Sequence, residues 1–363
     1  MIIPTTMTAV LLTGHGGTEM LEYRTDVPTP TVGPGDVLVR VGAAGVNNTD
    51  INTRIGWYSK SVTGATNAGA GGLDDVDRTD ATWSGTPLEF PRIQGADVCG
   101  EIVAVGAEVD PDRIGERVLG RAMMRHPQPD PANPFACWTL GSEADGGFAQ
   151  FTAMPAYGAV AVRSDWTDVE LASMPCASST AENMLQRASV GAERVLVTGA
   201  SGGVGSAAIQ LATRRGATVT AVCGASKADQ VAALGAHRVV DRDDDLLGAL
   251  ERNSFDVVVD LVAGDDWPAF MELLRPGGRY VTSGAIAGPI CEIDIRTLYL
   301  KDLTLFGATF QPDEVFADLV GYIERNEIRP LVAATYPLAD IARAQDDFVA
   351  KRHVGKLVLV PPR

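Results

Sequence analysis

Apolar residues in the first third of the chain fall in short runs broken by Gly and Pro. The stretches VLVRVGAAGV (37–46) and EIVAVGAEV (101–109) have the length and apolar content of strands, and Gly- or Pro-containing turns bound them. This pattern predicts a mostly β unit. From about Asp165 the pattern changes, and residues 170–188 have the spacing of an amphipathic helix.

Beyond residue 190, short apolar strands alternate with helical segments. Such alternation indicates a parallel sheet covered by helices on both faces, and therefore an α/β fold. A last helix at 313–326 precedes a closing strand at 356–360. The predicted strands of the alternating part are 194–200, 218–223, 238–241, 256–262 and 279–285, with predicted helices at 206–216, 227–235, 245–253 and 267–278.

The sharpest chemical signal is the stretch VLVTGASGGVGSAAIQLA (195–212), in which a strand runs into a Gly-rich turn that opens a helix. Small residues let the backbone approach a pyrophosphate closely, and the helix N-terminus offers free N–H groups and a positive dipole end. The position of the first Gly in the usual G-x-G-x-x-G pattern is held by Ala200. The strand–turn–helix context still predicts a dinucleotide site. Its residues are Ser201, Gly202, Gly203, Val204 and Gly205.

The end of the second strand of this unit (218–223) distinguishes NAD from NADP. An NAD site normally places Asp or Glu there to hold the ribose 2′-hydroxyl. Here the strand is followed by Gly224, Ala225, Ser226 and Lys227, with no carboxylate. A hydroxyl and an ammonium suit a 2′-phosphate, so we predict NADP(H). The alternative is that Ser226 caps the next helix and Lys227 is a solvated residue of its first turn.

Composition narrows the class of function. The chain has 363 residues, of which 30 are Lys or Arg and 46 are Asp or Glu, so its formal net charge is -16. This charge disfavours nucleic-acid binding and adhesion to anionic membranes. The five Cys are scattered rather than arranged as a disulfide framework, which is typical of a reduced cytoplasmic protein. We expect no signal peptide and no membrane span.

The segment 59–88 stands apart because it is rich in Gly, Ala, Thr and Asp and has almost no large apolar residue. A long segment without periodicity is either a functional lid or a surface insertion without function. It leaves the chain directly after Tyr58, so we expect it over the mouth of a substrate pocket, with Trp57 and Trp83 near the opening.

These motifs together resemble the medium-chain dehydrogenase/reductase superfamily, in its zinc-free quinone-oxidoreductase-like branch. The resemblance covers nearly the whole chain. It implies a GroES-like β domain built from residues 1–163 and 311–363, with a Rossmann domain of residues 164–310 inserted between them. The stretches that carry it are 35–50, 91–106, 114–120, 146–151, 173–185, the ASGGVG turn, 298–309 and 352–360.

The zinc-dependent alcohol dehydrogenases of this superfamily hold a catalytic metal on Cys, His-Glu and Cys residues. By resemblance, the first Cys falls on Asn47, the His-Glu pair on Ala96 and Asp97, and the second Cys on Cys176. An amide and a methyl group cannot complete a zinc site, so no metal is expected. The four-Cys structural lobe of those enzymes corresponds to 121–147, where His126 and Cys137 are at most half a site.

The resemblance also implies the residues around the nicotinamide. Asn47 and Tyr58 would face the substrate, the first as a hydrogen-bond donor and the second as a donor that can deliver a proton. The alternatives are a turn residue for Asn47 and an aromatic anchor for Tyr58. Thr180 would contact the nicotinamide, and Lys356 would lie near the cofactor phosphates or be a charge on a terminal strand.

Three further residues follow from the topology expected of the sheet. Val262, Gly284 and Ala285 lie at the carboxyl ends of later strands, where an open α/β sheet binds its ligand. We therefore include them among the residues expected to bind the cofactor.

The sequence thus predicts an NADPH-dependent enzyme that reduces quinones, enones or similar small carbonyl compounds without a metal. A conjugated acceptor spreads the incoming charge onto a distant oxygen, where ordinary hydrogen-bond donors suffice. The alternatives are an enoyl thioester reductase, an alcohol dehydrogenase of the same superfamily, and a non-catalytic NADPH-binding sensor. The strand 303–310 resembles the edge strand that extends the sheet between subunits, so a homodimer is expected.

Overall fold

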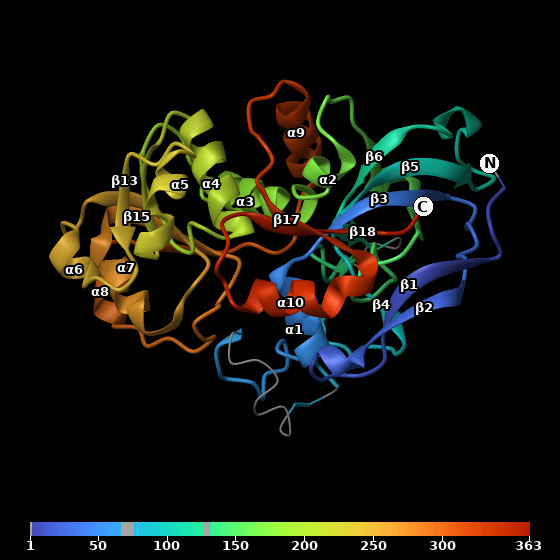
Figure 1. Ribbon diagram of the computed structural model, residues 1–363. Coiled ribbons are helices and arrows are strands. Elements are labelled where there is room, and N and C mark those ends of the chain that lie inside the picture. Colours follow the sequence, from blue (N-terminus) through green and yellow to red (C-terminus); the bar gives the residue numbers. More distant parts are fainter. Residues whose placement is uncertain (1, 67–75, 78, 127–130) are drawn as a thin grey trace.

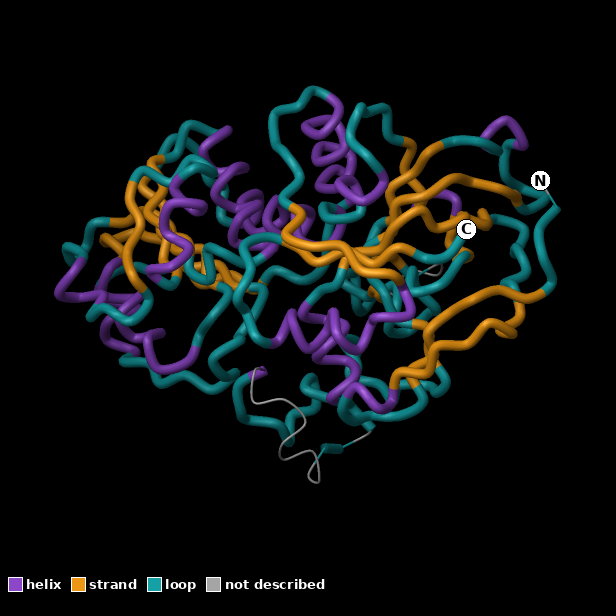
Figure 2. The backbone as a smooth tube through the Cα atoms, in the orientation of Figure 1, coloured by secondary structure: helices purple, strands orange, loops and turns teal. Residues whose placement is uncertain are grey.

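The computed structural model describes residues 2–66, 76–77, 79–126 and 131–363. Two units lie side by side in Figure 1: a mostly antiparallel β unit that contains both chain ends, and an α/β unit made from the middle of the chain. Figure 2 shows the strands gathered at these two places. Helices α1 (Asn48–Ile55) and α10 (Ile341–Val349) lie between the two sheets in this view.

The β unit contains a larger sheet whose order is β10-β6-β5-β3-β18-β17, with β9 also paired to β3. A smaller sheet has the order β2-β1-β4, and β7 and β8 form a separate hairpin. The predicted strand at 37–46 is confirmed as β3, and that at 101–109 begins earlier, as β5. The bounds are β1 Thr6–Leu12, β2 Leu21–Pro28, β3 Asp36–Gly45, β4 Arg92–Ile93, β5 Val98–Val105, β6 Arg117–Gly120, β7 Met123–Arg125, β8 Cys137–Thr139, β9 Phe151–Pro155, β10 Ala159–Ala161, β17 Val332–Pro337 and β18 Lys356–Val360.

The last strand of the chain completes the larger sheet. β18, predicted at 356–360, pairs antiparallel with β3, and Val358 lies opposite Gly45. Because β3 leads into α1, this pairing brings the start of β18 to the start of α1. Lys356 and Asn47 therefore come into contact although 309 positions separate them in sequence.

The α/β unit has a six-stranded sheet whose neighbouring strands are all parallel, in the order β13-β12-β11-β14-β15-β16. This is the doubly wound order, in which the chain switches direction between β11 and β14. The predicted parallel sheet is confirmed. The bounds are β11 Arg194–Val197, β12 Thr218–Cys223, β13 Arg238–Asp241, β14 Phe255–Asp260, β15 Leu274–Thr282 and β16 Thr304–Gly307.

Helices cover both faces of this sheet, which explains why the central residues of its strands are apolar on both sides. Val195 and Val197 of β11 pack into one core cluster, whereas Leu196 packs into another on the opposite face. The predicted helix at 170–188 is two helices, because a new helix begins at Pro175, where a missing N–H has no cost. The bounds are α2 Asp168–Leu171, α3 Pro175–Arg187, α4 Gly203–Arg214, α5 Ala228–Ala232, α6 Leu246–Ala249, α7 Trp267–Leu273, α8 Ile295–Leu300 and α9 Asp313–Glu324.

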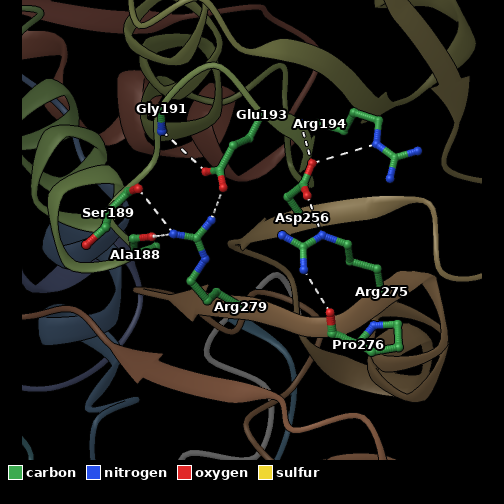
Figure 3. Close-up of polar contacts among 9 residues, drawn as sticks. All are labelled: Ala188, Ser189, Gly191, Glu193, Arg194, Asp256, Arg275, Pro276 and Arg279. Atoms are coloured by element: carbon green, nitrogen blue, oxygen red, sulfur yellow. Dashed lines mark hydrogen bonds and ion pairs between the residues drawn. The ribbon is translucent and has the colours of Figure 1, made fainter.

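Ion pairs hold the amino-terminal edge of this sheet (Figure 3). Asp256 of β14 accepts hydrogen bonds from the backbone N–H of Arg194 at 2.8 Å and from Nε of Arg275 at 2.5 Å. Arg279 of β15 pairs with Glu193 and also donates to the carbonyl oxygen of Ala188, which follows α3, at 2.6 Å. These contacts lie at the edge opposite to the carboxyl ends of the strands, so they support the fold rather than a ligand.

No helix among the described residues is long and apolar enough to cross a membrane. All five cysteines are free thiols. The positions of the boundaries between the two units, expected near residues 163 and 310, stay a prediction.

Candidate functional site

A cavity of about 750 Å³ lies at the carboxyl ends of β11, β14 and β15 and is bounded by residues of both units. Its position matches the place where open parallel sheets bind ligands. Ten of the predicted site residues line it: Asn47, Tyr58, Thr180, Gly202, Gly203, Val204, Gly205, Gly284, Ala285 and Lys356. The remaining four, Ser201, Ser226, Lys227 and Val262, lie outside its lining.

The Gly-rich turn forms one wall of the cavity, between β11 and α4. Gly199 has a φ of +55°, and a Cβ on Gly205 would lie 2.3 Å from the carbonyl oxygen of Gly199, so no larger residue fits at 205. Helix α4 begins at Gly203 with Gly202 as its N-cap. The N–H groups of its first turn have no acceptor within the helix and are available to an anion. The turn therefore fits the pyrophosphate of a dinucleotide.

Lys227 lies beside this turn. Its ammonium contacts Oγ of Ser201 at 3.4 Å and donates to the carbonyl oxygen of Lys351 at 2.5 Å. Burial and then the charge of Arg242 lower the pKa of Lys227. Ser226 is exposed in the short turn Ala225–Lys227, and no side chain caps that turn or α5. The alternative that Ser226 caps the following helix is therefore wrong.

The charge at the end of β12 includes a residue that the sequence analysis missed. Arg242 directly follows β13, and its N–H donates to the carbonyl oxygen of Cys223 at 2.9 Å. A Cβ on Gly224 would lie 3.7 Å from Nε of Arg242, so the guanidinium group lies against this glycine. The position of Arg242 directly after the third strand of the unit, which lies beside the strand that leads to Ser226 and Lys227, could have indicated its role.

Lys351 is a second missed residue. It follows α10 and lines the cavity, where its ammonium contacts Oδ1 of Asn48 at 3.4 Å. Burial, followed by the charges of Lys227 and Lys356, lowers its pKa to about 8. Three lysines therefore surround the Gly-rich turn, and this positive charge would be relieved by a polyanionic ligand.

Four polar groups meet at the floor of the cavity. Asn47 is the N-cap of α1, and its side chain forms a capping box with Asp50. Its Nδ2 donates to Oδ2 of Asp97 at 2.8 Å, and its Oδ1 accepts from the ammonium of Lys356 at 2.5 Å. The same ammonium lies 2.8 Å from Oδ2 of Asp97, whose Oδ1 accepts from the N–H of Cys176 at 2.6 Å.

The floor also contains a carboxyl group with an unusual pKa. Burial raises the pKa of Asp50 to about 7, although the N–H of Asn47 and the charge of Lys356 oppose this effect. The Oδ2 of Asp50 accepts that N–H at 2.8 Å. At neutral pH, the floor therefore balances one ammonium group against two carboxyl groups.

These residues do not fit a catalytic zinc ion, which takes three protein ligands of N, S or carboxylate type. Both oxygens of Asp97 already accept hydrogen bonds, and the ammonium of Lys356 lies where a second cation would approach them. Burial and then the charge of Asp97 raise the pKa of the Cys176 thiol, which disfavours the thiolate that metal binding needs. Within the described ranges, no group of three or more His, Cys, Asp or Glu could hold a metal ion.

His126 and Cys137 lie at the same end of the hairpin of β7 and β8, where Cys137 is opposite Arg125, and no group of three or more possible metal ligands among the described residues includes them. Cys137 is half-buried in the short strand β8, and burial raises the pKa of its thiol. His126 lines a separate cavity of about 500 Å³ together with Arg121 and Tyr157. Residues 127–130 lie outside the described residues.

Tyr58 lies between two tryptophans at the edge of the cavity. Its ring meets those of Trp57 and Trp83 edge to face, each with 5.8 Å between centroids. Its hydroxyl donates to Oγ1 of Thr49 at 3.1 Å. Burial raises its pKa to about 12, so the phenol stays protonated and can act as a donor. Both tryptophans line the cavity, where the sequence predicts them.

The beginning of the long insertion contacts the α/β unit. The N–H of Thr66 donates to the carbonyl oxygen of Ile286, beyond β15, at 3.1 Å. Nε1 of Trp57 donates to the carbonyl oxygen of Gly64 at 2.9 Å. The described start of the insertion therefore joins the two units at the mouth of the cavity, while residues 67–75 and 78 lie outside the described residues.

The remaining predicted residues lie close to the cavity. The N–H of Val262 donates to Oδ1 of Asp260 at 2.9 Å, and its side chain would meet a Cβ on Gly199 at 3.3 Å. The carbonyl oxygen of Ser201 accepts from the N–H of Gly355 at 3.0 Å, which ties the Gly-rich turn to the start of β18. Both residues therefore support the turn from behind rather than line the space.

Two sequence families match this chain: the alcohol dehydrogenase GroES-like domain over residues 33–164, and the zinc-binding dehydrogenase family over residues 203–325. A quinone oxidoreductase from Lama guanicoe is 27% identical over 369 residues, which cover 98% of this chain and 97% of that protein. An acryloyl-coenzyme A reductase from Metallosphaera sedula is 26% identical over 365 residues, which cover 97% of this chain and 99% of that protein.

A solved structure gives a higher identity. A protein from Sinorhizobium meliloti 1021, provisionally assigned as an alcohol dehydrogenase, is 46% identical with a TM-score of 0.87, and the match covers 99% of this chain and 98% of that one. The two family matches, the relatives and the fold agree. The chain belongs to the medium-chain dehydrogenase/reductase superfamily, in its quinone-oxidoreductase-like branch, and is an oxidoreductase with a nicotinamide-cofactor domain.

Proposed function

We propose that this protein uses NADPH to reduce quinones, enones or similar small conjugated carbonyl compounds without a metal ion. The observation that carries the proposal is the floor of the cavity, where Lys356 forms an ion pair with Asp97, a residue that by resemblance falls on a metal-ligand position of the alcohol dehydrogenases. The relative from Lama guanicoe, a quinone oxidoreductase, supports the same acceptor class.

The charges around the Gly-rich turn support NADPH over NADH. Lys227 and Arg242 lie at the end of β12 and β13, where an NAD site would carry a carboxylate. Ser226 is exposed beside them and can add a hydroxyl. A 2′-phosphate would neutralise this cluster, and the first turn of α4 would bind the pyrophosphate. Bound in this way, the cofactor supplies the hydride.

The cavity supplies hydrogen-bond donors for an acceptor oxygen. Tyr58 keeps its proton at neutral pH and lines the cavity together with Thr180. The tryptophan rings and Phe310 give the cavity apolar walls that suit a flat conjugated acceptor. These residues orient the acceptor and exclude water, and Tyr58 can hold a proton at its hydroxyl for the developing anion.

One assay can distinguish this proposal from three alternatives. The acryloyl-coenzyme A reductase relative favours an enoyl thioester reductase, against which the net charge of -16 argues mildly. An alcohol dehydrogenase would need an exchangeable metal. A binding protein without turnover would hold NADPH and reduce nothing.

The test is the oxidation of NADPH and of NADH with benzoquinone, an enone, crotonyl-coenzyme A and an isolated aldehyde. We expect turnover with the first two acceptors and a preference for NADPH. Metal content is measured on the same protein, purified without added metal, and we expect activity to survive chelation. About one zinc per chain, with activity lost on chelation, would contradict the metal-free part of the proposal.

We also propose that the protein is a homodimer. Strand β16 ends the sheet of the α/β unit, and exposed apolar side chains lie on this strand and on the segment 290–300 that precedes it. Light scattering after size exclusion should give twice the 38.2 kDa of the chain, and Leu305→Lys should shift the protein towards a monomer. A monomeric wild type would contradict this. The exposed apolar residues are Ile290, Ile293, Ile295, Tyr299, Leu300 and Leu305.

A further inference from the structure

The ammonium of Lys356 is buried at the floor of the cavity, with 5% of its side chain exposed. An ammonium group has three N–H donors. In the described chain, two acceptors are found for them, Oδ1 of Asn47 at 2.5 Å and Oδ2 of Asp97 at 2.8 Å. One donor therefore remains for a molecule in the cavity.

The hydrogen bonds of Asn47 give it a different role from the one that the sequence predicts. Its oxygen must face Lys356, because an ammonium group cannot accept a hydrogen bond, so its Nδ2 faces Asp97 and the carbonyl oxygen of Gly45. Both N–H groups are used within the protein. Asn47 therefore holds the ammonium in place and has no donor left for a substrate.

The surroundings keep this ammonium in one position. Its stem lies against the Gly-rich turn, since a Cβ on Gly203 would come within 2.7 Å of Cδ of Lys356. Asp97 lies behind it with a side chain that is 0% exposed, and a second buried carboxyl group, Asp50, is close by. A buried ammonium group that is paired with a carboxylate on one side and faces a cavity on the other can stabilise a second negative charge in that cavity.

We propose that the ammonium of Lys356 takes the place and the charge of a metal ion, and that it donates its free N–H to the carbonyl oxygen of the acceptor during reduction. The inference rests on the proposed function for the identity of the acceptor. It departs from the expectation that Lys356 serves the cofactor phosphates, and it moves the donor role from Asn47 to Lys356.

The reaction balances without further reagents. A hydride, which carries two electrons, forms a C–H bond to the conjugated carbon of the acceptor, and the nicotinamide is oxidised. The π electrons of the acceptor move to its oxygen, which becomes an enolate anion next to Lys356. The enolate then takes one proton, which Tyr58 supplies and recovers from water, and it tautomerises to the ketone product of an enone or to the hydroquinone product of a quinone. The ammonium lowers the energy of the anion without leaving its pair with Asp97.

The test compares three variants with the wild type. Lys356→Met removes the charge but leaves Asp97 buried and unpaired, which can prevent folding. The double variant Lys356→Met/Asp97→Asn removes both charges and keeps an acceptor for the N–H of Cys176. Arg24→Met is the control, because this exposed arginine lies on β2, outside the lining of the cavity. We expect kcat of the double variant to fall about 100-fold, with NADPH affinity preserved, and the control to match the wild type.

A second measurement does not depend on turnover. 4-Nitrophenol is bound to the NADP⁺ complex, and its ionisation is followed by absorbance as a function of pH. In this complex, the phenol oxygen of 4-nitrophenol takes the place of the carbonyl oxygen of the acceptor. The groups that face the ammonium are Asn47 and Asp50 of the α1 region, Asp97 before β5, Cys176 of α3 and Lys351 after α10. We expect the wild type to lower the pKa of the bound phenol and the double variant to lose this effect.

The outcomes separate this inference from the proposed function. A wild type that lowers the phenol pKa but reduces no acceptor supports the role of Lys356 and contradicts the proposed function. A double variant with unchanged kcat, or with an unchanged phenol pKa, overturns the inference. A double variant that loses NADPH affinity and keeps kcat shows that Lys356 is a cofactor ligand, and this too overturns it.

Discussion

The ammonium of Lys227 donates to the main-chain oxygen of Lys351 at 2.5 Å, and this hydrogen bond joins the α/β unit to the chain that follows α10. Lys351 adopts a left-handed backbone conformation there, with a φ of 50°. The contact places two lysines from distant parts of the sequence on the same side of the Gly-rich turn. Cofactor binding should therefore depend on both.

Lys227 and Arg242 should determine the preference for NADPH. Their charges lie against Ser201 and Gly224, where the 2′-phosphate is expected. A charge-assisted hydrogen bond contributes about 1.5–3 kcal/mol, so Arg242→Ala should lower kcat/KM for NADPH about 10- to 100-fold and leave NADH nearly unaffected. Steady-state kinetics with both cofactors measure the ratio. An equal loss for both cofactors would show that Arg242 does not read the phosphate.

Lys351 should make NADPH binding depend on pH. Burial and two neighbouring lysines lower its pKa to about 8, so its charge is lost as the pH rises from 7 to 9. The dissociation constant of NADPH should rise across this range, by about tenfold if one charge-assisted contact is lost. Fluorescence titration at several pH values measures it. In Lys351→Met the constant should already be raised at pH 7 and should stay flat between pH 7 and 9.

The same lysine should affect stability in the opposite direction. Its folded-state pKa of about 8 lies below that of an unfolded lysine, so the folded protein binds fewer protons between these values. The free energy of unfolding contributed by this group therefore increases as the pH rises through this window. Lys351→Met should raise the melting temperature of the cofactor-free protein at pH 7, and a lower melting temperature would contradict this.

Asp256 should stabilise the fold through the amino-terminal edge of the sheet. Burial alone would raise its pKa, but the hydrogen bonds from Arg275 and from the N–H of Arg194 lower it below its usual value. Its stabilising contribution is complete above the unfolded pKa of about 4 and is lost as the pH falls through the lower folded value. Asp256→Asn should cost about 2 kcal/mol in urea unfolding at pH 7, and less at pH 3. Glu89→Gln, at an exposed pair, is the control.

Trp83 should affect which acceptors enter. Its ring contacts Tyr58 edge to face and lines the cavity, although it belongs to the long insertion. Trp83→Ala should raise KM for small acceptors several-fold and allow bulkier ones, because one wall of the cavity is lost, while NADPH affinity stays constant. Kinetics with acceptors of increasing size test this. Identical KM values for all of them would show that the described end of the insertion does not shape the cavity.

The sequence predicted the α/β unit because its signals are local. Strands such as β11 and β14 contain unbroken apolar runs, at 195–197 and 257–259, and the turn from Ser201 to Gly205 begins a few residues after the end of β11. The topology rules for such alternation then indicate the edge of the sheet where the ligand lies. The closing strand β18 was also predictable from its own residues.

The contacts at the floor could not be predicted in the same way. Lys356 and Asn47 are 309 positions apart, and only the pairing of β18 with β3 brings them together. No local pattern shows that pairing, and a resemblance assigns Lys356 a role without its contacts. Arg242 was missed for a related reason, because its importance comes from the neighbouring strand β12. The roles predicted for the individual site residues stay predictions until the variants are measured.

Both charges of the ion pair of Lys356 and Asp97 belong to side chains of the polypeptide. A bound ion can be stripped by a chelator, exchanged for a competing metal or withheld when supply is short, whereas an ammonium group on a main-chain strand arrives with every newly synthesised copy. The positive charge at this position therefore does not depend on the supply of metal ions in the cell, and only mutation or a change in protonation can remove it.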